Sequence, residues 1–487
     1  MNAETFYKKI VNSLKLKKNG ATIADICAST DLPLATVGEL LPKAADEYSG
    51  HLRVTESGEI QYYFPNGFAS RYKGFGAVIK KISDKAAVFI KKSLVLLFKI
   101  WIMVMLIGYF LLFIALALAT VIIQITAKSG GKRSGSSRGG GLNFSAFEFI
   151  WRIWFINEVT RPSGYGKRNY GNSSAKKPKL PMHKAIFSFV FGEEDPNKNW
   201  DEIKDKAIIS FIQANRGVIS LSEYMVFTGE GILSAEENIL SFCSKFSGSP
   251  EVTEEGIIVY RFDKLLLQSD TNKQIEPAAP LKKPKAFSGN SKKTNAAFVA
   301  INTVNLLFGS YFLHQSFAAG KIVFNFTEPV IQGLYEAVYY FLGFIVSEPH
   351  NFIRVVLGLI PLVFSLFFWV IPAIRSLWER KENMKNKLSN FKRFCFSQIL
   401  NSPKNIDVDS LIPRQNEFFP DNLAAAADKI INDVGAFSIP EIAVKENGKM
   451  SYSFNELERE KQEVKKYREK IDTSKLQIGK TVFDSLN

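Results

Sequence analysis

The sequence predicts an α+β protein in which three small winged-helix-like modules are joined to a transmembrane helical region. Three observations indicate this: a recurring pattern of helices followed by strand–turn–strand, long apolar stretches between its copies, and positive charge concentrated in linkers. The chain has 487 residues, a formal net charge of +15, 46% hydrophobic residues and 41 Phe. Abundant Phe and Lys together are typical of a membrane protein with basic cytoplasmic flanks rather than of a soluble enzyme.

The recurring pattern opens at a Gly or Asn and closes at a Phe. The copies run from Gly20 to Phe64, from Gly217 to Phe262 and from Asn405 to Phe454, distances of 44, 45 and 49 positions. In each copy, helical periodicity gives way to a short alternating segment after a Gly-containing turn, which is the order of elements in a winged helix. The alternative is three unrelated helical hairpins that share Gly and aromatic endings by chance.

These copies set the predicted modules at 1–75, 185–270 and 379–471, the last with a charged helix at 455–471, followed by a tail at 472–487. The charged helix is too polar for a core, and we interpret it as an exposed helix or a partner-binding arm. A module of about 60 residues is marginally stable alone. Each module is therefore expected to pack against a neighbouring module or the membrane.

Two regions carry the apolar stretches, 86–127 and 296–378. Within the first, 94–126 is interrupted only by Lys99, and as one helix it would measure about 50 Å against a hydrocarbon core of about 30 Å. It is long for one span and short for two. Because both its flanks are basic, we favour a re-entrant hairpin that turns near Gly108 over a single tilted span.

The second region holds two apolar stretches, 296–317 and 352–377, separated by an expected interfacial helix at 328–346. The loop at 318–351 carries only Lys321 against three glutamates, whereas both outer flanks are rich in Lys and Arg. The positive-inside rule then places this loop outside and the second and third modules in the cytoplasm. We expect an integral protein of a bacterial inner membrane or its equivalent, with the modules mainly cytoplasmic.

Basic linkers at 128–184 and 271–295 join these parts. Their cations are predicted to contact anionic lipid headgroups, with a merely solvated tether as the alternative. The predicted headgroup contacts are Lys128, Lys132, Arg133, Arg138, Lys282, Lys283 and Lys285. In the first linker, a short helix at 144–159 places Phe147, Trp151, Trp154 and Phe155 on one face. That pattern is typical of an interfacial anchor, and burial against a module is the alternative.

No pattern for catalysis is present in the sequence. The glycines at 130–141 lack the Gly-Lys-Ser/Thr ending of a phosphate loop, and the four His and three Cys share no metal-ligand spacing. Sparse, separated Cys indicate a reducing compartment without a disulfide framework. We therefore predict no enzyme, no catalytic, cofactor-binding or metal residues, and no cofactor.

The candidate third helices of the modules, 33–48, 234–246 and 420–434, are each net negative. A helix that enters a DNA groove should be neutral to basic near the phosphates. The sequence thus favours an integral membrane scaffold or adaptor that presents its modules for protein contact at the cytoplasmic membrane face, with membrane shaping as a further expected role. The expected partners are a protein of unknown identity or a second copy, and anionic lipids; nucleic acid is disfavoured. A membrane-tethered DNA-binding regulator is the alternative.

Three segments resemble an uncharacterised membrane-protein family of cyanobacteria and chloroplasts: HKAIFSFVFGEEDPN at 183–197, GSPEVTEEG at 248–256 and IGKTVFDS at 478–485. The likeness spans most of the second module, the basic linker before it and the C-terminus. It implies a membrane protein without an established activity. Some members carry a label linked to iron–sulfur cluster biogenesis, but this chain has no clustered Cys to hold a cluster, so the label is not carried over.

Overall fold

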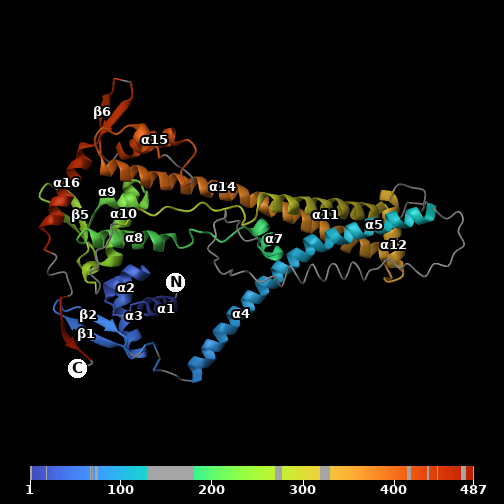
Figure 1. Ribbon diagram of the computed structural model, residues 1–487, viewed down its shortest axis with the longest axis horizontal. Helices are drawn as coiled ribbons and strands as arrows, with labels where there is room; N and C mark the ends of the chain where they lie inside the picture. Colours follow the sequence, from blue (N-terminus) through green and yellow to red (C-terminus); the bar gives the residue numbers. More distant parts are fainter. Residues whose placement is uncertain are drawn as a thin grey trace, which may run out of the picture. The chain divides into compact units, whose positions relative to one another are not determined.

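The computed structural model describes most of the chain in two compact units (Figure 1). The described residues are 3–128, 180–268, 277–318, 330–413, 418–472 and 479–485, without Lys18, Asn66, Ala69, 72–74, 436–437 and Asn447. The modular unit comprises 1–81, 195–284 and 382–487, and the helical unit comprises 82–194 and 285–381.

The first segment of the modular unit has three helices followed by a hairpin. These are α1 (Ala3–Leu14), α2 (Ile23–Thr30), α3 (Leu34–Glu47), β1 (His51–Thr55) and β2 (Ile60–Tyr63). Thr22 and Asp25 form a capping box that starts α2, and Ala21 just before it bridges Tyr62 of β2. The bridge closes the hairpin against the start of the second helix.

The second segment repeats this order with a full strand in place of the bridge. Its elements are α8 (Trp200–Ala214), β3 (Val218–Ser220), α9 (Leu221–Thr228), α10 (Ile232–Phe246), β4 (Ser249–Val252), β5 (Ile258–Arg261) and the 3-10 turn η2 (Asp263–Leu266). The antiparallel sheet has the order β3-β5-β4. Ser220 and Glu223 form the capping box of α9, at the position that Thr22 and Asp25 hold in the first segment.

The third segment begins with the end of the long helix α14 (Ile360–Asn401). It continues with η5 (Val408–Leu411), α15 (Leu423–Gly435), β6 (Glu441–Val444), β7 (Met450–Ser453) and α16 (Asn455–Lys470). An isolated bridge joins Ile406 to Tyr452 of β7, as Ala21 is joined to Tyr62. Here a four-residue 3-10 turn stands where the other segments have an eight-residue helix.

One buried apolar cluster runs through all three segments of the modular unit, from Ile10 and Val37 through Phe246 and Phe262 to Phe454. The predicted C-terminal tail also contributes structure: β8 (Thr481–Asp484) pairs antiparallel with β1 and gives the sheet order β2-β1-β8. The prediction of a plain tail at 472–487 is therefore wrong for these residues. Pairing with a strand more than 400 positions away leaves no local signal in the sequence.

In the helical unit, α4 (Phe75–Met103), the π-helical segment η1 (Val104–Gly108) and α5 (Tyr109–Lys128) follow one another without a break. Tyr109, directly after Gly108, has φ −63° and ψ −42°, which is ordinary right-handed helix. The re-entrant hairpin predicted near Gly108 is therefore wrong. The extra residue of a π-helical turn is accommodated inside a continuous helix.

The remaining helices of this unit are α7 (Met182–Phe191), α11 (Lys292–Ala318), α12 (Val330–Gly343), α13 (Pro349–Phe352), η4 (Ile353–Leu359) and the first part of α14. Figure 1 shows α11 alongside α14. The sequence assigned α7 to a module beginning at 185, but its Ile186, Phe189 and Val190 pack with Ile102 and Phe298 in the core of the helical unit. The second module therefore begins near Asp195.

Three helices among the described residues are long and apolar enough to cross a membrane: Ala86–Ile123, Lys292–Ala318 and Pro349–Asn401. On the last of these, Arg354 and Arg375 stand 21 positions apart. That separation is a rise of about 31 Å, close to the thickness of about 30 Å of a bilayer's hydrocarbon core. These two cations mark the ends of its apolar stretch.

Candidate functional site

The outer face of α10 is the most distinctive surface of the predicted third helices. Leu233 is 80% exposed and Leu240 is 53% exposed, while Glu236 and Glu237 between them are also exposed. The spacing of 3, 4 and 7 positions places these four side chains on one side of the helix. We call them the α10 docking face. The opposite side anchors the helix in the core of the modular unit through Ala235, Ile239, Phe242 and Phe246.

The cation of α10 turns away from this face. Lys245 Nζ donates to Asp31 at 2.6 Å and to Asp205 at 2.8 Å, which ties α10 to α2 and α8. The pKa of Asp31 is raised to about 7, mainly by burial. Repulsion from Asp205 also raises this pKa, whereas the hydrogen bond from Lys245 and its positive charge lower it. Hydrogen bonds to both carboxylates raise the pKa of Lys245 despite its burial. The helix therefore presents acid and Leu outward and keeps its Lys for an internal contact.

The acidic residues of the other two helices are largely neutralised within the chain. On α3, Glu39 accepts from Lys43 at 2.7 Å, and on α15, Asp433 accepts from Lys392 at 2.8 Å. Among the ion pairs of the described residues, none involves Glu236 or Glu237. The α10 docking face thus keeps its negative charge available.

The structure describes four of the seven predicted lipid-contacting cations. Lys282 Nζ lies 5.2 Å from the Trp200 ring centroid, and burial lowers the pKa of this Lys. Lys285 Nζ lies 3.7 Å from a carboxylate oxygen of Glu379, Lys283 is exposed, and Lys128 is the last residue of α5. Lys132, Arg133, Arg138 and the interfacial anchors Phe147, Trp151, Trp154 and Phe155 lie outside the described residues.

Helix α16, predicted to be an exposed helix or a partner-binding arm, packs on the second segment instead. Its Val464 is buried with Val218 and Val259. Arg468 donates to the Val218 carbonyl at 2.9 Å and to Glu223 at 2.6 Å. Ser222 donates to the buried carboxylate of Glu460, whose pKa is raised by burial. The prediction is wrong because the charges that made the helix look solvated are used in contacts within the chain.

In the helical unit, polar side chains bind backbone carbonyls inside the apolar region. Asn302 Nδ2 donates to the Ser365 carbonyl at 3.0 Å, and Asn305 Nδ2 donates to the Leu106 carbonyl at 2.7 Å. Both Asn side chains are fully buried. Their acceptors lie on other helices, and contacts of this kind have no signal in the sequence.

At the end of the same bundle, Arg375 holds the last turn of α7. Its guanidinium donates to the Phe189 carbonyl at 2.8 Å and the Phe287 carbonyl at 2.7 Å, and also to both oxygens of Glu379 at 2.7 and 2.8 Å. Carbonyls in the last turn of a helix have no partner within the helix, so this contact completes α7. It explains why a ten-residue helix belongs to this unit.

His, Cys, Asp and Glu are the potential metal ligands in the part of the chain that the structure describes. No group of three or more His, Cys, Asp or Glu there is arranged to hold a metal ion. Cys27 and Cys243 are buried, and burial raises the pKa of their thiols to about 12 and about 11. Such thiols stay protonated and are poor ligands and nucleophiles at neutral pH.

The fold thus combines helices suited to a membrane with a three-segment modular unit. Comparison with known proteins finds a similar uncharacterised chloroplastic protein of Arabidopsis thaliana. It is 24% identical over 409 residues, which cover 78% of this chain and 70% of the relative. No protein-family model matches the chain, and no solved structure matches it. The relative fits the resemblance to an uncharacterised chloroplast family, and the cyanobacterial side of that resemblance rests on the three motifs alone.

Proposed function

We propose that this protein is a membrane-anchored scaffold or adaptor whose modular unit binds another protein through the α10 docking face. In this proposal each segment of the modular unit is a winged-helix-like module. The order helix, bridge or strand, helix or turn, helix, hairpin recurs in all three, and the β3-β5-β4 sheet is the arrangement that a winged helix requires. Helix α10 then holds the position that reads DNA in nucleic-acid-binding members of that fold class.

One observation carries the proposal: the α10 docking face is acidic and apolar. A helix that approaches DNA meets a phosphate backbone whose affinity for protein comes mainly from Lys and Arg. Glu236 and Glu237 would repel phosphates, and the exposed Leu233 and Leu240 offer apolar area to a protein partner. The complementary ligand is a basic amphipathic helix, which would place apolar residues on the two Leu and cations on the two Glu.

The helical unit supplies the anchor in this proposal, with the second and third segments on the basic side. The basic residues flanking α11 and α14 support that orientation through the positive-inside rule. Membrane shaping loses one of its two supports, since α4, η1 and α5 form a continuous helix rather than a shallow hairpin. The other, the helix expected at 144–159, lies outside the described residues.

A pull-down from native membranes tests the proposal. The full chain, tagged and solubilised in mild detergent, is compared with a variant carrying Leu233→Ser and Leu240→Ser. The expected result is a protein partner with a basic amphipathic segment that is recovered with the wild type and depleted at least about tenfold with the variant, which corresponds to about 1.4 kcal/mol. Ile439→Ser is the matched control, because Ile439 is 83% exposed on the third segment.

Two outcomes would overturn the proposal. The first is equal recovery of the same partner by the Leu variant. The second is sub-micromolar binding of duplex DNA by the full chain, with affinity that falls steeply as salt rises, which would support the DNA-binding regulator. Recovery of a differently tagged second copy through the same face would identify the partner as the protein itself.

A further inference from the structure

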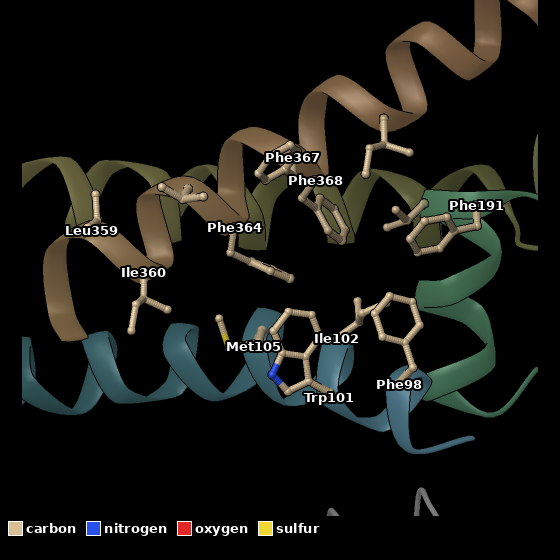
Figure 2. A pocket seen from close by; sticks show the side chains of 13 residues that line it. Phe98, Trp101, Ile102, Met105, Phe191, Leu359, Ile360, Phe364, Phe367 and Phe368 are labelled. Atoms are coloured by element: carbon tan, nitrogen blue, oxygen red, sulfur yellow. The ribbon is translucent and has the colours of Figure 1, made fainter. Parts of the chain in front are cut away.

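A lateral groove in the helical unit lies between α4 with η1, α7, and η4 with α14 (Figure 2). It encloses a volume of about 500 Å³, and the side chains that line it are all apolar. The lining residues are Phe98, Trp101, Ile102, Met105, Val190, Phe191, Leu359, Ile360, Val363, Phe364, Phe367, Phe368 and Ile371. Sites for small ligands span about 300–1,000 Å³, so the groove has room for one extended chain.

Two aromatic contacts define the shape of this groove. Trp101 of α4 meets Phe364 of α14 edge-on, with ring centroids 6.2 Å apart and an interplanar angle of 89°. At the α7 end, Phe98 and Phe191 lie with centroids 5.9 Å apart. Figure 2 shows the labelled side chains of α4 and α14 facing each other across the groove, with Phe191 at the α7 end.

The groove lies at the depth of the hydrocarbon layer. Its α14 residues, 359–371, fall between Arg354 and Arg375, which mark the ends of the apolar stretch. Trp101 is 52% exposed and Phe367 is 58% exposed, so the groove opens sideways, toward the position of lipid around a spanning helix. Lipid chains, rather than water, are the medium it meets.

The ammonium group of Lys99 lies at the α7 end of the groove. Lys99 Nζ lies 4.3 Å from the Phe187 ring centroid, and Phe187 lies 4.9 Å, centroid to centroid, from the groove residue Phe191. Lys99 makes no ion pair among the described residues, whereas Arg375, which binds the last turn of α7, is paired with Glu379. An ammonium group at the end of an apolar groove is complementary to a molecule with an anionic head and an apolar tail.

Both π-helical segments also contribute to the groove, Met105 from η1 and Leu359 from η4. Turns of this kind occur often at functional sites, because they change the direction in which side chains point from a helix. Here each is fixed by a hydrogen bond from a neighbouring helix: Asn305 to the Leu106 carbonyl, and Tyr109 to the Val356 carbonyl at 2.9 Å. The groove is thus held open by packed and hydrogen-bonded elements.

We propose that this groove binds one acyl chain of an anionic phospholipid, with Lys99 at its headgroup. Inside a membrane, burial of an acyl chain gains little from the hydrophobic effect, because the surrounding lipid tails are equally apolar. Selection therefore comes from shape along the groove and from charge at Lys99. A Lys near an anionic lipid surface contributes about 1 kcal/mol, which corresponds to a preference of about fivefold over a zwitterionic lipid.

Native mass spectrometry of the full chain tests this proposal. The protein is reconstituted with equal amounts of phosphatidylglycerol and phosphatidylcholine that carry the same acyl chains, and it is then released in mild detergent. We expect one retained phospholipid, with phosphatidylglycerol favoured about fivefold. Val363→Phe fills the groove and should abolish retention. Leu366→Phe, on the same helix but outside the lining, should leave retention unchanged. Lys99→Gln should keep the lipid but lose the preference.

A second measurement does not require the groove-filling variant Val363→Phe to fold. Brominated acyl chains quench Trp fluorescence on contact, so brominated phosphatidylglycerol should quench the wild type more strongly than a Trp101→Phe variant. The proposal is overturned by equal lipid retention in wild type and Val363→Phe, by equal quenching in wild type and Trp101→Phe, or by retention of a free fatty acid in place of the phospholipid. An unchanged headgroup preference in Lys99→Gln would refute the role of Lys99.

Discussion

Asn305 and Leu106 form the contact that joins α11 to the first π-helical segment: the side-chain amide of Asn305 donates to the Leu106 carbonyl at 2.7 Å. Tyr109, just after that segment, donates to the carbonyl of Val356 in the second π-helical segment. Where a π-helical turn interrupts α-helical hydrogen bonding, it can leave a carbonyl that needs another donor. In a lipid environment that donor must come from the protein.

Replacement of Asn305 by Leu tests this contact. The change keeps the branching and the number of side-chain heavy atoms but removes the donor. We expect a loss of about 0.6 to about 1.7 kcal/mol, which are the mean and the maximum for hydrogen bonds between membrane helices. The measurement is the midpoint of unfolding of the full chain in mixed micelles of mild detergent and SDS. Ser310→Ala is the control, because Ser310 is exposed and bonds only within its own helix. Equal midpoints for the two variants would contradict the prediction.

Gly358 is expected to be intolerant of any side chain. A Cβ at this position would lie 2.9 Å from Leu313 Cα and 3.0 Å from Leu313 N, both backbone atoms of α11. Close approach of helices through small residues is a main source of packing energy in membranes. Gly358→Ala should therefore cost about 1–3 kcal/mol.

The matched control for Gly358 is Gly108→Ala. At Gly108 a Cβ would meet Val104 Cγ1 at 3.6 Å, an ordinary contact. Thermal unfolding of the full chain in detergent compares the two. A larger loss for Gly108→Ala than for Gly358→Ala would contradict this prediction.

Asp484 anchors the C-terminal strand to the first segment. Arg53 Nε donates to its carboxylate at 2.8 Å, and the Arg53 guanidinium lies 3.8 Å from the Tyr63 ring centroid. Asp484→Ala should release β8, so that the amides of Leu52 and Glu56, which donate to Ser485 Oγ and the Lys480 carbonyl, exchange faster with solvent.

Hydrogen exchange measured by NMR or by mass spectrometry with fragmentation resolves these amides. The Thr55 amide, which donates to the Glu59 carbonyl within the hairpin, should keep its protection in Asp484→Ala. Val482→Ala should leave all three amides protected, because Val482 is 69% exposed. Loss of protection at Thr55 together with the others would mean that the variant unfolds the hairpin rather than releasing β8.

The Asp31–Lys245–Asp205 cluster should make the stability of the modular unit depend on pH. The folded-state pKa of Asp31 is about 7, above the value of about 3.9 for an unfolded Asp, so the folded state binds the proton more tightly. The stability that this group contributes is complete below pH 4 and is lost as pH rises from about 4 to about 7.

Asp31→Asn should remove that dependence and keep the hydrogen bond from Lys245. As pH rises from 5 to 8, we expect the thermal midpoint of the variant to rise relative to that of the wild type. Each kcal/mol of stability that the wild type loses corresponds to about 2–4 °C. Thermal unfolding of the full chain across this pH range measures it. A wild-type advantage that grows with pH would contradict the prediction.

The apolar stretches were predictable because their signal is local. Residues 94–126, 296–317 and 352–377 are each a predominantly apolar stretch of the length, about 20 residues, that a membrane span needs, and each lies on a helix long enough to cross. The charge at Lys99 was visible too. Its place beside Phe187 at the end of a groove was not, because that neighbour comes from a helix more than 80 positions away.

The α10 docking face was predictable in part. The sequence showed that Glu236 and Glu237 outnumber Lys245 on this helix, and the net negative charge follows from composition alone. Which side of the helix faces outward followed only from the packing of Ile239 and Phe246 into the core. The inward turn of Lys245 depends on Asp31, the C-cap residue of α2, and on Asp205 of α8.

The sequence by itself determined where the apolar stretches and the recurring order of helices and hairpin lie, since periodicity and hydropathy act over a few turns of chain. Tertiary structure decided what those elements touch. It placed α7 with the helical unit through Arg375, laid α16 on the second segment through Arg468, and added β8 to β1 through Asp484. These contacts join residues far apart in the chain, and a hydrogen bond or ion pair formed at such separation is set by three-dimensional packing, which leaves no periodic trace in the sequence.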